Sequence, residues 1–360
     1  SITGLDSNPV FSLCKILWVR NNHPKVYDKA DKWLQMTDYI IYKLSGIIAT
    51  DYSLASRTLA FDVLNSKMSD EILNEFNVSK ELFPKIVDGG TCLGTVSKKA
   101  NEETGLSADV KVVMGGHDHP CAALTANALG GGKVLDSSGT AESFIMVSDK
   151  DKVPVMQAKG QRVCRYLDSR RYTYWAGIIS SGATFEWAYQ RLTDSKFWQF
   201  EDSDYSYDDV LAQVSNVEPG ANGLLFMPHL RGSGAPYWNP GMKGFLLGIT
   251  SRTSPQEIMK SVLEGLSFQA RMIVKMYEEL TCSRINTLCV VGGSGKNQEW
   301  QQIKADITGK RIEVSEHSEA TVLGAAMLAA IGAGLYKDMD SAAFNVFSDS
   351  RIYLPNGKNK

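Results

Sequence analysis

The sequence predicts an α/β protein with more than one domain, on three observations. First, 360 residues are too many for one ordinary hydrophobic core, so we expect two domains, or one domain and a large remainder. Second, the buried-strand run at 112–114 leads through Gly115 and Gly116 into an alanine-rich helix. Third, the same order of strand, glycine turn and helix returns at 287–307.

Composition excludes several classes of function. With 43% hydrophobic and 22% charged residues, the sequence is typical of a soluble globular protein. A formal net charge of -2 gives no electrostatic case for nucleic acid or an anionic membrane as a partner. No apolar run reaches the ~18 residues of a membrane span. No signal peptide opens the chain, and Ser1 is not an initiator methionine.

The cysteines indicate a reducing compartment. They show no paired Cys-x-x-Cys spacing and are scattered through apolar runs, at Cys14, Cys92, Cys121, Cys164, Cys282 and Cys289. We therefore expect reduced, packed thiols in a cytoplasmic protein, without a disulfide or zinc framework.

Helices dominate the first third of the sequence. Amphipathic patterns predict helices at 12–20 and 31–44, the second ended by Gly46. Short helical pieces follow at 71–76, 80–82 and 100–104, and strands at 94–96 and 111–114. Residues 51–58 are polar and turn-forming, which indicates a loop that lines a site or a plain surface loop.

Asp118 stands at the first corner between a strand and a helix. Gly115 and Gly116 supply the turn, and Pro120 suits the first position of the helix. A carboxylate just before a helix feels the positive end of the helix dipole, so we expect it to be ionised and fixed in direction. Asp118 is therefore a candidate acceptor of a hydroxyl proton. From this stretch alone, an Asp that only satisfies backbone N–H groups is an open alternative.

A linker at Gly130-Gly-Gly132 opens the second half. Residues 133–147 indicate two strands joined by a Ser-Ser-Gly-Thr turn, followed by a strand at 172–177 and a helix at 182–192. Backbone N–H groups and hydroxyls at such a tip suit phosphate oxygens, and an ordinary hairpin turn explains the same pattern.

A long helix is predicted at 254–279, after a Gly- and Pro-rich loop at 226–239, because Ser254-Pro255 is a helix-start signal. The second corner then runs from the strand at 287–291 through Gly292-Gly-Ser-Gly295 into a helix at 298–307. It is neither a dinucleotide fingerprint, which needs Gly at 298, nor a P-loop, which needs Gly at 290 and Ser or Thr at 297. A glycine turn before a helix suits a nucleotide, and tight strand-helix packing explains it as well.

These motifs together resemble the FGGY group of sugar and polyol kinases, which includes xylulose, ribulose, gluconate and glycerol kinases. The sharpest similarity is Gly244-Phe-Leu-Leu-Gly-Ile249 followed by Glu257-Ile-Met-Lys-Ser-Val-Leu-Glu264. Further motifs occur in family order: Thr3-Gly4 before 12–18, Gly115-Gly-His-Asp118, Ser138-Gly-Thr140, Ser181-Gly182 with Trp187, and 291–297. The order covers nearly the whole chain, which is more specific than any single motif.

The resemblance implies two actin-like (ribonuclease-H-like) domains with a cleft between them. Residues 1–129 would be the C-terminal part of the sugar-binding domain, 130–352 the ATP-binding domain, and 353–360 a polar tail. The resemblance also implies that Asp118 is the general base that takes the proton of a sugar hydroxyl as the hydroxyl attacks ATP. Asp118 would help to hold Mg²⁺, and His119 would contact the sugar.

The same resemblance assigns the nucleotide contacts. Gly139 and Thr140 would lie at the phosphates, with Gly182 and Glu186 near the nucleotide. Gly292, Gly293, Ser294 and Asn297 would flank the adenosine. Partners would be a sugar or polyol, a ketose such as a pentulose first, and ATP or ADP, without nucleic acid or membrane. A homodimer is the base-rate expectation for the assembly.

Three departures from the family pattern matter. The family's opening phosphate hairpin, Asp-x-Gly-Thr-x-x-x-Arg, is missing from the sequence, and the usual C-terminal helix also has no counterpart, so we expect a truncated chain with an incomplete first domain. Whether such a chain binds nucleotide or transfers phosphate is left open by the sequence. Arg231-Gly-Ser-Gly-Ala-Pro-Tyr-Trp238 replaces the usual Gly-Glu-Arg loop, and His119 stands where many members have Gln.

Parts of the sequence are also compatible with two other functions. His117-Asp118-His119 has the spacing of metal ligands in a loop, but His23, His229 and His317 have no motif around them, which disfavours a transition-metal hydrolase. The stronger alternative is a nucleotide-binding regulator or a catalytically silent homologue of the same fold, since fold does not imply function.

Overall fold

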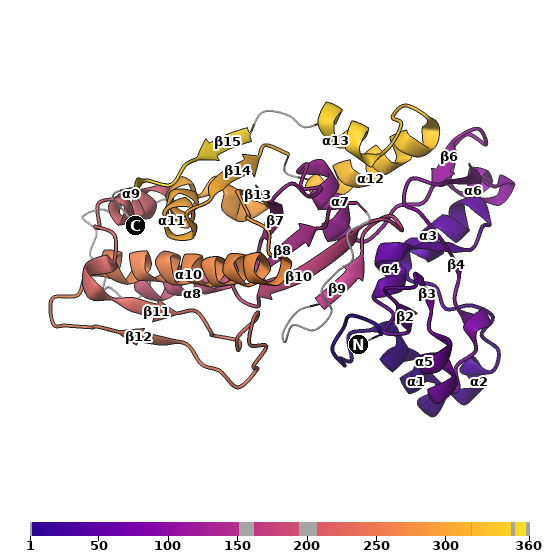
Figure 1. The fold of residues 1–360 in the computed structure, drawn as a ribbon, viewed down its shortest axis with the longest axis horizontal. Coiled ribbons are helices and arrows are strands. Elements are labelled where there is room, and N and C mark those ends of the chain that lie inside the picture. Colours follow the sequence, from indigo (N-terminus) through magenta and orange to yellow (C-terminus); the bar gives the residue numbers. More distant parts are fainter. Residues whose placement is uncertain (1, 151–161, 194–206, 318, 347–349, 358–360) are drawn as a thin grey trace.

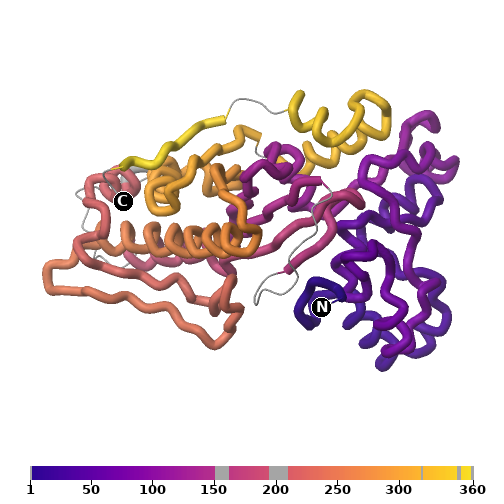
Figure 2. The backbone as a smooth tube through the Cα atoms, in the orientation of Figure 1, coloured from indigo at the N-terminus to yellow at the C-terminus, as the bar shows by residue number. Residues whose placement is uncertain are grey.

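The computed structural model describes residues 2–150, 162–193, 207–317, 319–346 and 350–357. Figure 1 shows a smaller lobe of helices and short strands, formed by the N-terminal third, beside a larger lobe built on one sheet. Figure 2 shows that the late, yellow part of the chain returns towards the smaller lobe. There α12 (Ala320–Ala333) packs against β6 (Lys111–Val113) and α7 (Asp118–Thr125), so the two lobes share contacts from both ends of the sequence.

Among the described residues, seven strands form the main sheet in the order β15-β14-β13-β7-β8-β10-β9. Their bounds are β7 (Lys133–Ser138), β8 (Glu142–Val147), β9 (Arg162–Arg165), β10 (Tyr172–Ile178), β13 (Thr287–Val291), β14 (Arg311–Ser315) and β15 (Ser350–Tyr353). β8 pairs antiparallel with β7 and β10, and β9 pairs antiparallel with the other edge of β10, while β13 lies parallel to β7 and β14 parallel to β13. The predicted pair of strands at 133–147 is confirmed.

Side chains that alternate along the strands build a core on each face of this sheet. Val134 and Phe144 belong to the core under α8 (Gly182–Thr193), α10 (Pro255–Thr281) and α11 (Gln298–Thr308). Leu135 and Ile145 point to the opposite core, with α7, α12 and α13 (Met339–Val346). The larger lobe is thus a sheet with helices on both faces, as the predicted α/β class requires.

The long predicted helix is confirmed as α10, and its start has a local cause. Ser254 Oγ accepts a hydrogen bond from the Glu257 amide at 3.3 Å, and Glu257 Oε2 accepts one from the Ser254 amide at 2.8 Å. This capping box, with Pro255 in the first turn, satisfies N–H groups that have no partner inside the helix.

The smaller lobe has short strands in pairs and several helices. Its helices are α1 (Ser12–Asn22), α2 (Pro24–Tyr27), α3 (Met36–Ser45), α4 (Tyr52–Ser56), α5 (Asp70–Glu75), η1 (Lys80–Leu82) and α6 (Lys98–Thr104). Its strand pairs are β1 (Ala49–Asp51) with β4 (Lys85–Val87), β2 (Phe61–Asp62) with β3 (Lys67–Met68), and β5 (Cys92–Thr95) with β6. The helix expected at 31–44 begins at Met36, because Gln35 and Asp38 form a capping box there.

Other expectations need correction. Residues 51–58 are the end of β1 and the helix α4 rather than a loop. The polar tail predicted at 353–360 begins with Tyr353, which is the last residue of the edge strand β15. The remaining elements are α9 (Tyr207–Ser215), η2 (Ala221–Gly223), β11 (Leu225–Met227), β12 (Phe245–Leu247) and η3 (Gly293–Lys296). In the described part of the chain, every helix is too short or too polar to cross a bilayer.

Candidate functional site

Asp118 lies at the junction of the two lobes, as the first residue of α7. The helix begins two residues earlier than the position of Pro120 predicts, with His117 as its N-cap residue. The side chain of Asp118 is 61% exposed. The carboxylate therefore sits on the first helical turn, open to solvent, where the helix dipole favours negative charge.

Two neighbours hold one oxygen of this carboxylate. Asp118 Oδ1 lies 2.6 Å from His117 Nδ1 and accepts a hydrogen bond from the His119 amide at 2.6 Å. The bond with His117 lowers the pKa of Asp118 well below its usual value and outweighs the opposing effect of burial. Among the described residues, no hydrogen bond reaches Oδ2. Asp118 thus offers an ionised carboxylate with one oxygen open.

An aromatic side chain fixes the two histidines that flank Asp118. The rings of His117 and His119 lie edge-on to Trp175 of β10, with centroids 5.0 and 5.6 Å away. Burial lowers the pKa of His119, which favours its neutral imidazole. The guanidinium of Arg57 lies 4.9 Å from the centroid of the same Trp175 ring. No local sequence pattern indicates a role for Trp175 or Arg57, because both contacts join segments far apart in the chain.

A second aspartate, Asp51, is connected to this corner through Ser53. Ser53 Oγ accepts a hydrogen bond from the His117 amide at 2.9 Å and donates one to Asp51 Oδ2 at 2.6 Å. Asp51 caps α4 by accepting from the amides of Ser53 and Leu54 at 2.9 and 3.0 Å. Burial raises the pKa of Asp51 to about 7. Residues 51–58 therefore support the candidate site, and the Asp-x-Ser capping pattern is the signal that could have revealed it.

The structure brings Gly139, Thr140 and Gly182 together at the tip of the β7–β8 hairpin. The carbonyls of Gly139 and Thr140 accept hydrogen bonds from the amides of Gly182 and Ser181, each at 3.0 Å. A Cβ on Gly182 would lie 2.4 Å from the Gly139 oxygen, so only glycine allows this approach. The hairpin tip is exposed, while the first amides of α8 are used by the hairpin itself.

Glu186 lies one turn further along α8. Its side chain is exposed and accepts a hydrogen bond from Gln190 Nε2 at 2.7 Å. Gly182 and Glu186 thus sit on successive turns of one helix, at positions four residues apart that share a face.

The second glycine corner borders a cavity of about 540 Å³. Gly292 and Gly293 line it, together with Gly295, Lys296, Val314, Ser315, Glu316, His317, Glu319 and Arg351. Asn297 has a different role, because its Oδ1 caps α11 by accepting from the Trp300 amide at 2.9 Å. Ser294 Oγ is buried without a hydrogen bond among the described residues. Of the four residues expected at the adenosine, the two glycines face the cavity.

The start of α12 lies between this cavity and Asp118. Thr321 Oγ1 donates to the Asp118 carbonyl at 3.5 Å, and Glu319, two residues earlier, lines the cavity. In the described part of the chain, no three His, Cys, Asp or Glu side chains gather as they would around a transition metal. A hard cation such as Mg²⁺ needs only one or two protein carboxylates and keeps water ligands, so the exposed carboxylate of Asp118 is a candidate ligand for it.

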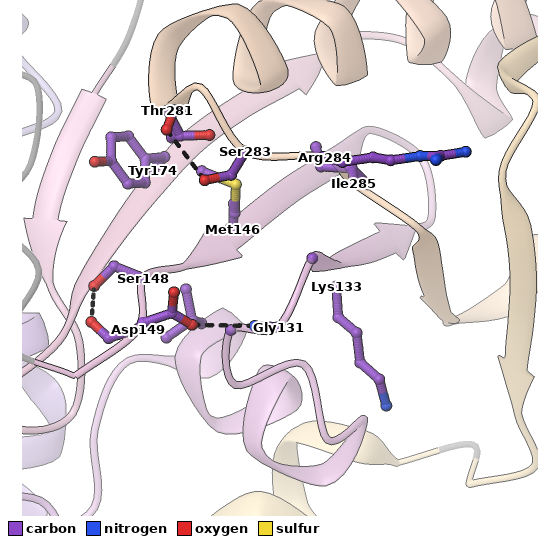
Figure 3. Close-up of a pocket in the computed structure, with 13 residues that line it drawn as sticks. Gly131, Lys133, Met146, Ser148, Asp149, Tyr174, Thr281, Ser283, Arg284 and Ile285 are labelled. Atoms are coloured by element: carbon purple, nitrogen blue, oxygen red, sulfur yellow. Dashed lines mark hydrogen bonds between the residues drawn. The ribbon is translucent and has the colours of Figure 1, made fainter.

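Two other cavities lie away from the predicted residues. Figure 3 shows a small one, about 40 Å³, where the turn at 130–133 meets the end of α10. The side chains of Lys133 and Arg284 extend away from it. Its volume of about 40 Å³ is too small for a nucleotide. A larger cavity of about 650 Å³ lies between residues 6–8 and the loop with Tyr237 and Trp238. The loop that departs from the family pattern therefore lines a cavity, with Arg162 4.3 Å from the Trp238 ring.

Comparison with known proteins covers almost the whole chain. Residues 1–125 match the N-terminal domain, and residues 135–333 the C-terminal domain, of the FGGY family of carbohydrate kinases. Similar relatives include the xylulose kinase of Bacillus subtilis strain 168, 27% identical over 350 residues, and the L-fuculokinase of Escherichia coli K12, 28% identical over 357 residues. These alignments cover 97% and 99% of this chain, and 68% and 72% of the relatives.

Solved structures agree in fold. The gluconate kinase of Lactobacillus acidophilus has a TM-score of 0.86 at 24% identity, covering 99% of this chain and 70% of that one. The Plasmodium falciparum glycerol kinase with ADP has a TM-score of 0.87 at 24% identity, covering 98% and 69%. The expected two-domain α/β fold, actin-like in this family, is confirmed. The division at residues 129 and 352 stays a prediction.

Proposed function

The chain belongs to the FGGY family of carbohydrate kinases, and on that premise we propose that it transfers the γ-phosphoryl group of ATP to a sugar or polyol hydroxyl with Asp118 as general base. The observation that carries this proposal is the open Oδ2 of an ionised carboxylate at the junction of the lobes. Oδ1 is occupied by His117 and His119, so Oδ2 is the atom that would accept the hydroxyl proton.

A weak base is sufficient for this chemistry. Phosphoryl transfer passes through a loose transition state, so the enzyme mainly positions the reactants and neutralises charge. The hydroxyl proton leaves late, and a carboxylate of low pKa can take it. His119, whose lowered pKa favours the neutral imidazole, would hydrogen-bond a second hydroxyl of the acceptor. Mg²⁺, held by Asp118 directly or through water, would neutralise negative charge on the phosphate oxygens.

ATP would lie between the hairpin tip and the second glycine corner. Gly139 and Thr140 are exposed at the tip, and Gly292 and Gly293 line the cavity of about 540 Å³. Gly182, Glu186, Ser294 and Asn297 complete the proposed nucleotide site. The packing of Gly182 on the hairpin and the capping by Asn297 support indirect roles for these two, through the shape of the site.

A ketose such as a pentulose is the first candidate acceptor, since several relatives are named xylulose kinase. The experiment is ADP formation by the complete protein with Mg·ATP and a panel of ketoses, polyols and aldonates. ADP that depends on one sugar supports the kinase and identifies its substrate. Nucleotide binding without sugar-dependent ADP across the panel would favour a regulatory or silent homologue instead.

The nucleotide part has its own test at Gly293. A Cβ there meets no atom within 4 Å, so Gly293→Val should fold normally and fill part of the cavity. We expect ATP affinity to fall about tenfold or more, with sugar affinity little changed. Gly357→Val is the control, because a Cβ at Gly357 also meets no atom within 4 Å and Gly357 lies outside the proposed nucleotide site. Unchanged ATP affinity in Gly293→Val would remove Gly293 from the site.

A further inference from the structure

A buried ion cluster of Asp136, Glu142 and Lys304 lies beneath the β7–β8 hairpin and takes no part in the chemistry proposed above. Lys304 of α11 donates to Asp136 Oδ2 at 2.5 Å and to Glu142 Oε1 at 2.7 Å. All three residues are 0 to 1% exposed. Asp136 and Glu142 belong to β7 and β8, so one ammonium group joins the two strands of the hairpin.

The cluster is close to electrical neutrality. Burial raises the pKa of Asp136 well above its usual value. Burial also opposes ionisation of Glu142, but the charge of Lys304 and the hydrogen bonds to Glu142 outweigh it and lower the pKa of Glu142. These opposite directions favour a protonated Asp136 and an ionised Glu142, whose negative charge faces the ammonium group of Lys304.

The ion cluster is connected to each segment that meets at the proposed phosphate site. Ser181 Oγ donates to Glu142 Oε2 at 2.5 Å, directly before the first residue of α8. Glu142 lies opposite Ser138 in the hairpin register, and these residues bracket the tip at 139–141. A Cβ on Gly292 would lie 2.4 Å from the Ser138 carbonyl oxygen, so the second glycine corner packs on the same strand end.

Stability alone does not account for such a cluster. Buried ion pairs can often be replaced by apolar side chains without loss of stability, because desolvation offsets their attraction. The surroundings are already apolar: Lys304 Nζ lies 5.3 Å from the Trp300 ring, which stacks at 6.2 Å on Phe185 of α8. The ion pairs contribute a defined geometry, because they fix the positions of β7 and β8 relative to each other and, through Ser181, that of the start of α8.

We propose that Lys304 is a positioning residue, whose ion pairs with Asp136 and Glu142 hold the hairpin tip and the start of α8 in the arrangement that binds the nucleotide phosphates. The proposal rests on the proposed function, because it needs a nucleotide at the tip. Lys304 touches no reacting atom. Its effect is exerted through the backbone at 138–142 and 181–182, where a displacement of about 1 Å is enough to cost large factors in binding or rate.

The test compares Mg·ADP affinity, by calorimetry, with thermal stability in four proteins. They are the wild type, Lys304→Met, the charge-free triple variant Asp136→Asn/Glu142→Gln/Lys304→Met, and Lys260→Met. Lys260 is a matched control, because this buried lysine forms an ion pair at 2.8 Å with the half-buried Glu299, between α10 and α11, without touching the hairpin. Lys304→Met leaves two buried carboxyl groups without a cation and should lose stability.

In the triple variant we expect thermal stability to recover while Mg·ADP affinity stays about tenfold or more below that of the wild type. Lys260→Met should lose stability but keep its affinity. A folded triple variant with wild-type affinity overturns the proposal, because charge balance and not position would then be the role of Lys304. A wild type that binds no Mg·ADP overturns the proposed function as well, and so the two failures are distinguishable.

A milder variant keeps the proposal testable if the triple variant does not fold. Ser181→Ala removes only the bond between the ion cluster and α8, so folding should be preserved. We expect a several-fold loss of Mg·ADP affinity and faster hydrogen exchange in the peptide that spans 133–147. Unchanged affinity together with unchanged exchange contradicts the proposal.

Discussion

Asp51 and Asp118 occupy similar places at two strand-to-helix corners that are in contact, but they differ in exposure, hydrogen bonding and pKa. Each aspartate lies where a strand gives way to a helix, β1 to α4 and β6 to α7. Asp51 is 0% exposed, and both of its oxygens accept hydrogen bonds from Ser53 or Leu54. Asp118 is 61% exposed and has one oxygen open. Burial raises the pKa of Asp51 to about 7, while His117 holds that of Asp118 low.

The difference in environment indicates a structural role for Asp51 and a chemical role for Asp118. A buried carboxyl whose oxygens are all used can cap a helix but has no access to a substrate. An exposed, ionised carboxylate with a free oxygen can accept a proton or bind a cation. Two titratable groups whose surroundings push their pKa values apart are a recurrent feature of acid–base sites. The proposed base is therefore Asp118, and Asp51 supports it through Ser53.

Asp118→Asn should produce the largest effect. The amide keeps the size of the side chain but is a far weaker proton acceptor, so we expect turnover to fall by about three orders of magnitude or more. ADP affinity and thermal stability should change little. The measurement is kcat from sugar-dependent ADP formation, with Asp109→Asn on an exposed loop as the control. Near-normal turnover would exclude Asp118 as the base.

Asp51→Ala should have the opposite profile, with a large effect on stability. It leaves the Ser53 hydroxyl and the amides of Ser53 and Leu54 without their buried acceptor, which should cost about 3 kcal/mol in free energy of unfolding. Asp62→Ala is the matched control, since Asp62 also accepts three hydrogen bonds but in an exposed turn. The measurement is urea unfolding. Equal losses of unfolding free energy in the two variants would show that burial does not make the hydrogen bonds of Asp51 more stabilising than those of Asp62.

Sequence reasoning succeeded where a local pattern is sufficient. The helix α10 follows from Ser254-Pro255 and Glu257, and the hairpin from two strand-like runs around Ser138-Gly139-Thr140. The family follows from motifs kept in order. Asp118 was singled out because a glycine turn before a helix is visible in the sequence. Apart from the family, which follows from the whole chain, each of these features is encoded by residues that are neighbours in the sequence.

It failed where the structure depends on distant segments. The residues around Trp175 do not indicate that its ring packs on His117 and His119. Those around Lys304 do not indicate that it pairs with Asp136, 168 positions away in the sequence. The polar composition of residues 51–58 predicts a loop, because composition does not reveal that these side chains face one another inside the fold. Asn297 has the family position of a nucleotide contact, and only the structure shows that its side chain caps α11.

The pH dependence of stability should report Asp51 separately from Asp118. The folded pKa of Asp51, about 7, exceeds the unfolded value of 3.8, so between these pH values the folded state binds the extra proton. Stability should therefore fall as the pH rises from about 4 to about 7 and then level off. Asp38, with a pKa raised by burial to about 6, adds to the same slope.

Asp51→Asn should flatten this slope by at most about 1.4 kcal/mol per pH unit, because one titrating proton is removed. Asp118→Asn should leave the contribution of Asp51 to this slope unchanged, because the pKa of Asp118 is lowered and its own transition lies below pH 4. Urea unfolding at pH 5, 6, 7 and 8 provides the measurement. Equal slopes in the wild type and Asp51→Asn would mean that Asp51 does not titrate in this range.

Ser53→Ala should give the smallest effect and the sharpest test of the connection between the two corners. Ser53 Oγ joins Asp51 Oδ2 to the amide of His117, so its loss should cost about 1 kcal/mol in stability. Because His117 in turn holds Asp118, we also expect kcat to fall about tenfold, with ADP affinity unchanged. Ser56→Ala, which removes a buried hydroxyl from the same helix without touching His117, is the control. A stability loss without any change in kcat would show that the two corners act independently, and would limit Asp51 and Ser53 to capping α4.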